Sequence, residues 1–392
     1  MPLGRRRAVR PVRSHCRIRC HLPEARRLMT RPLSVLFMTR YPVEGASSRY
    51  RVYQYLPHLQ ALGVKAEVQS LMDSDMYRLS TQHGRTLSKI GATLRAVVRR
   101  LWALRRWRDY DIVYMQRELL PFGPPVIERW LKARGAVLLF DYDDALFIHK
   151  RSRYSPLASL LRAPGKVREL FRLVDCTVAG NNWLRDAATA EGGHAVTLEV
   201  AEDTARIPMH APHTNEQPVT IGWLGSPSTV KYLSLIQPIL QKIAARHPNL
   251  RWEIMGGGTF EMPGVPWRGH DWSLQDELAA LARYDIGLMP LPSEDWAQGK
   301  SGGKARTYMA AGVVPVCSAI GYNNELLRHG ETGFLCQTKQ DWEDALDALI
   351  LDADLRQRIA VTARAEVQAR FDPAKQAAAM RAIFDQVLEA RA

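Results

Sequence analysis

A glycine- and lysine-rich stretch that runs straight into a hydrophobic segment constrains the fold of this chain more than any other feature. Residues 299–316 read GKSGGKARTYMAAGVVPV, and Lys300 and Lys304 flank a pair of glycines. Glycines let the backbone approach a ligand closely, and residues 304–311 are typical of a short helix that ends at a glycine. Lysines beside the free N–H groups of a helix start favour anions. Residues 313–317 predict a buried parallel strand. We therefore expect an α/β domain with a phosphate site here, the alternative being an ordinary surface turn.

The rest of the chain repeats this strand–helix alternation. At 392 residues it is too long for one ordinary core and suits two domains. Prolines at 208, 212 and 218 indicate a linker between them. We predict two doubly wound, Rossmann-like domains with a cleft between them, over residues 32–207 and 219–372, a linker over 208–218 and a final helix over 373–392. The predicted strands are 33–38, 64–70, 111–116, 136–141, 176–179 and 195–200 in the first half, and 219–224, 250–255, 267–270, 285–291 and 313–317 in the second.

The net charge of +14 is concentrated at the N-terminus, where residues 1–31 hold ten arginines and a single acid, Glu24. This head lacks hydrophobic periodicity and the apolar core of a secretory signal, so we expect it to be disordered. An unused start codon upstream of Met29 would also explain it. Cys16 and Cys20, with a histidine beside each, could hold zinc, although chance is the simpler explanation. Nothing requires disulfides, which fits a reducing cytoplasm. Because most of the excess charge lies in this head, we expect no nucleic-acid partner.

Residues 85–108 form a second basic feature, in which arginines and a lysine alternate with leucine, valine and tryptophan at helical spacing and no acid occurs. Such a helix suits the surface of an anionic membrane. The alternative is a packed helix whose basic face is simply solvated. No run of about 18 uncharged apolar residues occurs, so the sequence predicts no transmembrane helix.

Two further loops follow predicted strands, where α/β sheets place their chemistry. Asp141, Asp143 and Asp144 follow the strand at 136–141; they could hold a metal, position a hydroxyl or only cap a turn. Residues 225–229 (GSPST) precede a predicted helix over 230–246, which suits phosphate oxygens. The first loop lacks the G-x-G-x-x-G of a dinucleotide site, which argues against NAD.

Several of these segments, in order, resemble the GT-B glycosyltransferases of the retaining family 4 type. They are IGWLGSPSTVKYL, YDIGLMPL, GKSGGKARTYMAAGVVPV and NNELLRHGETGFL in the second half. In the first half, GASSRYRVYQYLPHLQALG and FDYDDALF resemble a subgroup associated with polysaccharide or lipopolysaccharide assembly. The resemblance covers nearly all of residues 33–385.

The resemblance implies a nucleotide-sugar donor whose diphosphate lies against the second domain, with helix ends and cations stabilising the leaving group. It implies no cofactor and no metal. The donor-binding residues that it indicates are Gly225, Ser226, Ser228, Thr229, Lys231, Lys300, Lys304, Thr307 and Glu325. From the first domain, Gly45, Ser47, Ser48 and Arg49 would close over the donor, and Asp143 or Asp144 would act in catalysis on the sugar or the acceptor hydroxyl.

The chain departs from the family at its Glu-x7-Glu pattern. The two glutamates would fall at Gly299 and Thr307, where this chain has none. Because the second glutamate holds the ribose in the family, we expect Glu294, Asp295 or Glu325 to substitute. The family's arginine and lysine of the donor loop are replaced by a serine and, approximately, Lys231. The family's histidine beside the sugar has no clear counterpart, and the DYDD segment stands in its region.

We therefore expect a retaining hexosyltransferase-type enzyme that transfers sugar to a glycan or lipid-linked acceptor, in the cytoplasm at the inner face of the plasma membrane, in cell-surface polysaccharide synthesis. A nucleotide-sugar epimerase of the same fold and a catalytically degenerate binding protein remain alternatives. The sequence does not specify the nucleotide, the sugar, the acceptor or the linkage.

Overall fold

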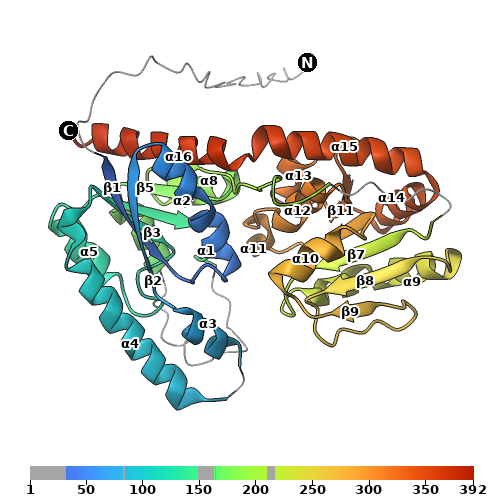
Figure 1. The fold of residues 1–392 in the computed structure, drawn as a ribbon, viewed down its shortest axis with the longest axis horizontal. Coiled ribbons are helices and arrows are strands. Elements are labelled where there is room, and N and C mark those ends of the chain that lie inside the picture. Colours follow the sequence, from blue (N-terminus) through green and yellow to red (C-terminus); the bar gives the residue numbers. More distant parts are fainter. Residues whose placement is uncertain (1–31, 83, 149–162, 164, 210–216) are drawn as a thin grey trace, which may run out of the picture. The chain divides into compact units, whose positions relative to one another are not determined.

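The computed structural model describes residues 32–82, 84–148, 163, 165–209 and 217–392. The Arg-rich head, with its Cys16 and Cys20, and most of the expected linker lie outside these residues. The described residues contain two parallel sheets of six strands each, which Figure 1 shows with their helices. The predicted α/β class with two doubly wound sheets is confirmed.

The first sheet has the strand order β2-β1-β3-β4-β5-β6. Its strands are β1 (Leu33–Thr39), β2 (Val64–Ser70), β3 (Ile112–Gln116), β4 (Leu138–Tyr142), β5 (Cys176–Ala179) and β6 (Ala195–Thr197). The central strands β3 and β4 are buried at every position, as expected for parallel strands covered by helices on both faces. The order reverses between β1 and β3, and ligands of such sheets bind at the carboxyl ends of the strands beside this point.

Among the described residues, the helices of the first half are interrupted at one place where the sequence has continuous helical spacing. They are α1 (Ala46–Arg51), η1 (Tyr53–Tyr55), α2 (Leu56–Ala61), α3 (Ser74–Thr81), α4 (Thr86–Leu104), η2 (Trp107–Asp109), α5 (Val126–Ala133), α7 (Lys166–Leu173) and α8 (Asn182–Ala190). The sequence indicates one helix over residues 49–62, but the structure divides it. Pro57 lies in the first turn of α2, where its missing N–H costs nothing; inside a continuous helix it would remove a hydrogen bond.

The second sheet has the order β12-β11-β10-β7-β8-β9, which reverses between β7 and β10. Its strands are β7 (Thr220–Leu224), β8 (Arg251–Met255), β9 (Arg268–His270), β10 (Ile286–Met289), β11 (Val314–Ser318) and β12 (Phe334–Cys336). The helices are η3 (Val230–Ile236), α9 (Gln237–Arg246), α10 (Leu274–Leu281), α11 (Asp295–Gln298), α12 (Gly303–Ala311), α13 (Asn323–Leu326), α14 (Lys339–Leu351), α15 (Ala353–Arg370) and α16 (Pro373–Glu389). The predicted helix over 230–246 therefore begins as a 3-10 segment, and α9 starts only where Pro238 is tolerated in its first turn.

Helix α16 belongs to the core of the first sheet although it ends the chain. Ala377, Met380 and Phe384 are buried among the apolar side chains of β1 and β3. The ring of Phe384 lies 6.3 Å from that of Phe37 and 5.9 Å from that of Tyr114, centroid to centroid. None of the described helices is long and apolar enough to cross a membrane.

Candidate active site

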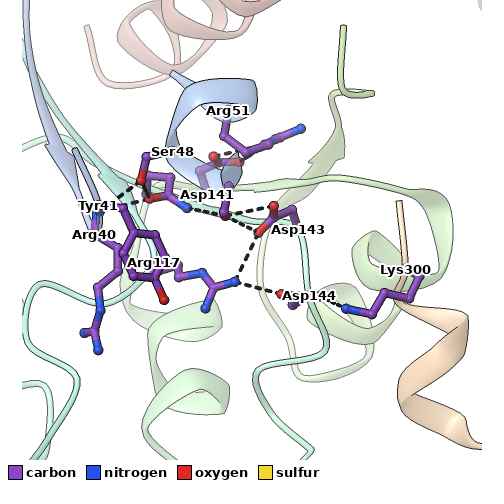
Figure 2. Close-up of polar contacts among 11 residues, drawn as sticks. Arg40, Tyr41, Ser48, Arg51, Arg117, Asp141, Asp143, Asp144 and Lys300 are labelled. Atoms are coloured by element: carbon purple, nitrogen blue, oxygen red, sulfur yellow. Dashed lines mark hydrogen bonds and ion pairs between the residues drawn. The ribbon is translucent and has the colours of Figure 1, made fainter. Parts of the chain in front are cut away.

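The carboxyl edge of the first sheet gathers polar side chains from three loops, which Figure 2 shows in close-up. Ser47, in α1, donates to Asp143 and lies 2.9 Å from both carboxylate oxygens. Gln116, at the end of β3, donates to the Ser47 hydroxyl at 3.0 Å and accepts from Ser48 at 2.7 Å. The turn before α1 is tight, since a Cβ at Gly45 would lie 2.3 Å from the Cβ of Tyr41. Of the predicted loop residues, Ser47 thus contacts the predicted Asp143 directly, and Ser48 is joined to Ser47 through Gln116.

Asp144 lies between two cations from different parts of the chain. Its carboxylate accepts from Arg117 at 2.7 Å and from Lys300 at 2.6 Å (Figure 2). Burial disfavours the ionised carboxylate, but Lys300 and Arg117 outweigh it and hold the pKa of Asp144 below its usual value. A carboxylate in this state is a weak proton acceptor. Its geometry suits it to positioning Lys300, while Asp143 accepts from Ser47 and lies 3.6 Å from Arg117.

Asp141 has a structural role. It is fully buried and forms a bidentate ion pair with the buried Arg51 of α1. Arg51 also donates to the carbonyl of Leu198. Asp141 therefore pairs with Arg51, whereas Asp143 and Asp144 share Arg117, and no cluster of three or more metal-ligating side chains occurs among the described residues.

The two predicted anion loops of the second half meet at the switch point of its sheet. Lys304, in the first turn of α12, packs across Gly225, where a Cβ would lie 2.7 Å from the lysine Cε. The ammonium lies 5.1 Å from the centre of the Trp223 ring and has no anionic or hydrogen-bonding partner within the described part of the chain. Burial and the nearby Lys300 lower the pKa of Lys304 to about 8. A partly buried cation without a counter-charge, at the start of a helix, favours an anionic ligand.

The hydroxyl residues that follow Gly225 are open to solvent. Ser226 and Ser228 are exposed, with their hydroxyl oxygens 2.8 Å apart. Thr229 donates back to the Ser226 carbonyl at 3.1 Å. This loop precedes the 3-10 segment η3 rather than an α-helix, so we expect its hydroxyl groups to contribute more than a helix dipole. Lys231 is exposed, and its ammonium lies over the ring of Tyr232 at 5.3 Å.

Thr307 is shielded from solvent and has a carboxylate partner that the sequence analysis missed. It is buried and donates to Glu202 at 2.9 Å. Glu202 is 1% exposed and also lies 3.7 Å from Arg306. Burial raises the pKa of Glu202, although Arg306 and Thr307 oppose this. A carboxylate therefore stands beside position 307, but it comes from the segment that joins the two sheets.

The glutamates expected to substitute have other partners. Glu325 accepts from Asn182 at 2.6 Å, and Arg370 binds its carbonyl. Glu294 is exposed and accepts from the indole of Trp296. Arg49 is buried and donates to the Glu44 carbonyl at 3.2 Å. Its guanidinium therefore holds the loop that precedes α1.

Two further residues of the site were not predicted. Arg117 follows β3 with a positive φ of 67°, rare for a residue with a side chain. Asn181 caps α8 and donates to the carbonyls of Gln298 and Lys300, which fixes the loop that carries Lys300. The position of Arg117 directly after a buried strand was an available signal. Nothing local marks Asn181, because its partners lie more than a hundred residues away.

A separate open pocket of about 570 Å³ lies beside β8, β9 and α10. Its lining includes Glu253, Arg268, His270 and Arg283 but none of the predicted site residues. Glu253 and Arg283 are paired at 2.7 Å, so two of its charges already neutralise each other.

Comparisons with known proteins bear on the fold of the chain. Residues 218–352 match the family described as glycosyl transferases group 1. Sucrose-phosphate synthase from Thermosynechococcus elongatus is similar in structure, with a TM-score of 0.65 and 13% identity over 91% of this chain and 100% of that one. HepE from Anabaena, solved with UDP and glucose, has a TM-score of 0.62 and 14% identity over 90% of this chain and 100% of its own. A glycosyltransferase from Rickettsia africae has a TM-score of 0.61 and 14% identity over 91% of this chain and 99% of its own. No curated protein matches. The chain thus has the GT-B fold, and residues 218–352 of its second half match the model of glycosyl transferases group 1.

Proposed function

We propose that this protein is a retaining glycosyltransferase that moves a hexosyl group from a nucleotide sugar to a glycan or lipid-linked acceptor. The observation that carries the proposal is Lys304, a cation with no counter-charge among the described residues, packed over Gly225 at the switch point of the second sheet. The group 1 match covers this site, and structures of HepE hold UDP and UDP-glucose. A role in cell-surface polysaccharide synthesis at the inner membrane face completes the proposal and rests on the resemblance.

The donor diphosphate would lie between Gly225 and the start of α12. Lys304, the exposed hydroxyls of Ser226 and Ser228, and the half-buried Thr229 would contact its oxygens. As the glycosidic bond breaks, negative charge grows on the leaving diphosphate, and a preorganised ammonium stabilises that charge more than it stabilises the ground state. No metal or cofactor is needed in this scheme.

Lys300 and Asp143 would act on the sugar side. Asp144 holds Lys300 through a contact of 2.6 Å, so the lysine is already aimed at the edge that carries Asp143. Asp143 would accept a hydrogen bond from the sugar or the acceptor hydroxyl in place of the one it now receives from Ser47. Retention of the anomeric configuration follows from the family resemblance and is tested by NMR of the product.

The buried pair of Thr307 and Glu202 would replace the second glutamate of the family pattern. Its carboxylate approaches the same position of α12 from the segment between the sheets. In this proposal the pair supports the wall against which the nucleoside lies.

The experiment combines calorimetric titration of UDP, GDP and dTDP with an assay of sugar transfer. Lys304→Ala should weaken binding of the preferred nucleoside diphosphate about 10- to 100-fold, which is the worth of a charged hydrogen bond. Asp143→Asn should keep that affinity and lower transfer. The matched control is Lys339→Ala, which removes an exposed lysine of the same half.

Three results would count against the proposal. Unchanged affinity in Lys304→Ala would remove the diphosphate from this site. If the wild-type protein unfolds cooperatively yet binds none of the nucleotides, the degenerate binding protein becomes the better explanation. Conversion of a nucleotide sugar without transfer would favour an epimerase.

A further inference from the structure

Helix α4 has an inner face that is fixed to the carboxyl edge of the first sheet. Ala92, Ala96, Arg100 and Leu104 are buried at intervals of four residues. The buried guanidinium of Arg100 donates to the side chain of Gln69 at 2.6 Å, to the Leu119 carbonyl at 3.0 Å and to the carbonyl of Thr39. These acceptors lie in or just past β1, β2 and β3. The helix is therefore joined to the edge of the sheet that carries Ser47 and Asp143.

The opposite face of α4 is an exposed apolar stripe. Leu87, Leu94, Val98 and Leu101 are 85%, 63%, 66% and 44% exposed, and Trp102 beside them is 62% exposed. Steps of seven, four and three residues keep these side chains on one side of a helix. Scattered exposed apolar residues are ordinary, but a stripe that follows a helix for four turns marks a contact surface. The outward side of α4 thus presents a continuous run of apolar side chains.

Exposed arginines flank this stripe. They are Arg95, Arg99, Arg105, Arg106 and Arg108, and residues 85–108 contain no acid. Arg99 is paired with Asp73 at 2.8 Å and Arg106 with Asp109 at 3.1 Å. Arg95 and Arg105 form no ion pair in the part of the chain that the structure describes, so their charge is available to a partner. That partner must offer both apolar and anionic groups.

We propose that the outward face of α4 inserts into the surface of an anionic bilayer, and that the sugar acceptor is carried on that bilayer. An apolar ridge edged by arginines fits acyl chains beneath anionic headgroups. A second copy of this chain would bring two sets of arginines together, which disfavours a dimer through this face. Because Arg100 joins α4 to the carboxyl edge of the first sheet, docking would hold that edge at a fixed distance from the lipid. The part that concerns the acceptor rests on the proposed function.

The experiment is sedimentation of the full-length chain with vesicles of phosphatidylcholine alone or mixed with phosphatidylglycerol. The wild-type protein should bind the mixed vesicles and lose most of that binding at high salt. The variant L94E/V98E/L101E should bind at least about tenfold more weakly, since three exposed apolar side chains that would insert into the lipid become negative charges that it repels. The control L351E/V361E changes exposed apolar residues outside α4 and should bind like the wild type.

Trp102 reports the depth of contact. Brominated lipid should quench wild-type tryptophan fluorescence more than that of Trp102→Phe. Failure of the wild-type protein to bind, or equal binding of L94E/V98E/L101E and wild type, would overturn the proposal, the second result assigning lipid contact to another segment. Self-association that the α4 variant abolishes, without lipid binding, would also overturn it. Nucleotide titration separates this proposal from the previous one, because the α4 variant should bind the nucleoside diphosphate normally.

Discussion

Lys304 is the residue whose chemistry depends most on its surroundings. Its pKa of about 8 lies within the working range of an enzyme, because burial and Lys300 disfavour the ammonium. If the ammonium is the form that binds the diphosphate, affinity should fall about tenfold between pH 7 and pH 9, as the protonated fraction does. Calorimetry across this range tests it. Lys304→Met should bind weakly with no such dependence, and a wild-type affinity that stays constant to pH 9 would contradict the assignment.

At the same scale, local pattern predicted some site residues and missed others for a physical reason. Lys304 and Gly225 could be selected from the sequence alone, because a glycine or a lysine next to a predicted strand–helix junction indicates an anion site. Glu202 and Asn181 act through partners far away in the sequence, so only the folded chain reveals them. The Asn182 partner of Glu325 is likewise distant in the sequence, so only the folded chain shows this contact.

Helix α4 shows at the scale of one element how a buried charge is held by carbonyls. Arg100 has no carboxylate among its hydrogen-bond partners, and burial together with Arg40 and Arg99 lowers its pKa to about 9. Arg100→Met should keep the packing but remove the donor that serves the carbonyls of Thr39, Gln69 and Leu119 and the Gln69 side chain, at a cost of about 2–4 kcal/mol in the free energy of unfolding. Urea denaturation measures this. Arg95→Met, on the exposed face, should change it by less than about 0.5 kcal/mol. Equal stability of the two variants would show that solvent replaces the lost donor.

The existence of most elements follows from the sequence, but their faces and breaks do not. Runs of buried apolar residues fixed the strands, because a parallel strand covered on both sides has no polar positions. The periodicity of residues 85–108 predicted a helix there. It did not predict that Arg100 lies on the buried face of α4, because an arginine is expected on the solvent-exposed face. Pro57 was visible in the sequence; that it starts a new helix depends on how α1 docks, through Arg51 and Asp141.

At the scale of the whole molecule, the last two helices connect the two cores. The described residues from Leu33 to Ala392 form one compact unit. Ala363, Val367 and the following Phe371 pack in the core of the second half, whereas Met380 and Phe384 pack in that of the first. One continuous segment of chain, α15 followed by α16, therefore contributes to both cores. We infer that the two halves do not unfold independently.

Phe384→Ala tests this coupling. The substitution removes a ring that packs against Phe37 and Tyr114, and should cost about 3–5 kcal/mol because the cavity lies in a rigid core. Hydrogen exchange should show the loss of protection in β1 and β3, more than 250 residues away in the sequence, because α16 completes their core. The control Val361→Ala, on the exposed side of α15, should leave that protection unchanged. If Phe384→Ala released only α16 while β1 and β3 stayed protected, the helix would be an attachment to a sheet that is stable without it. If α16 and the strands β1 and β3 instead lost protection with the same free energy of opening, the last helix would be a necessary part of the first domain.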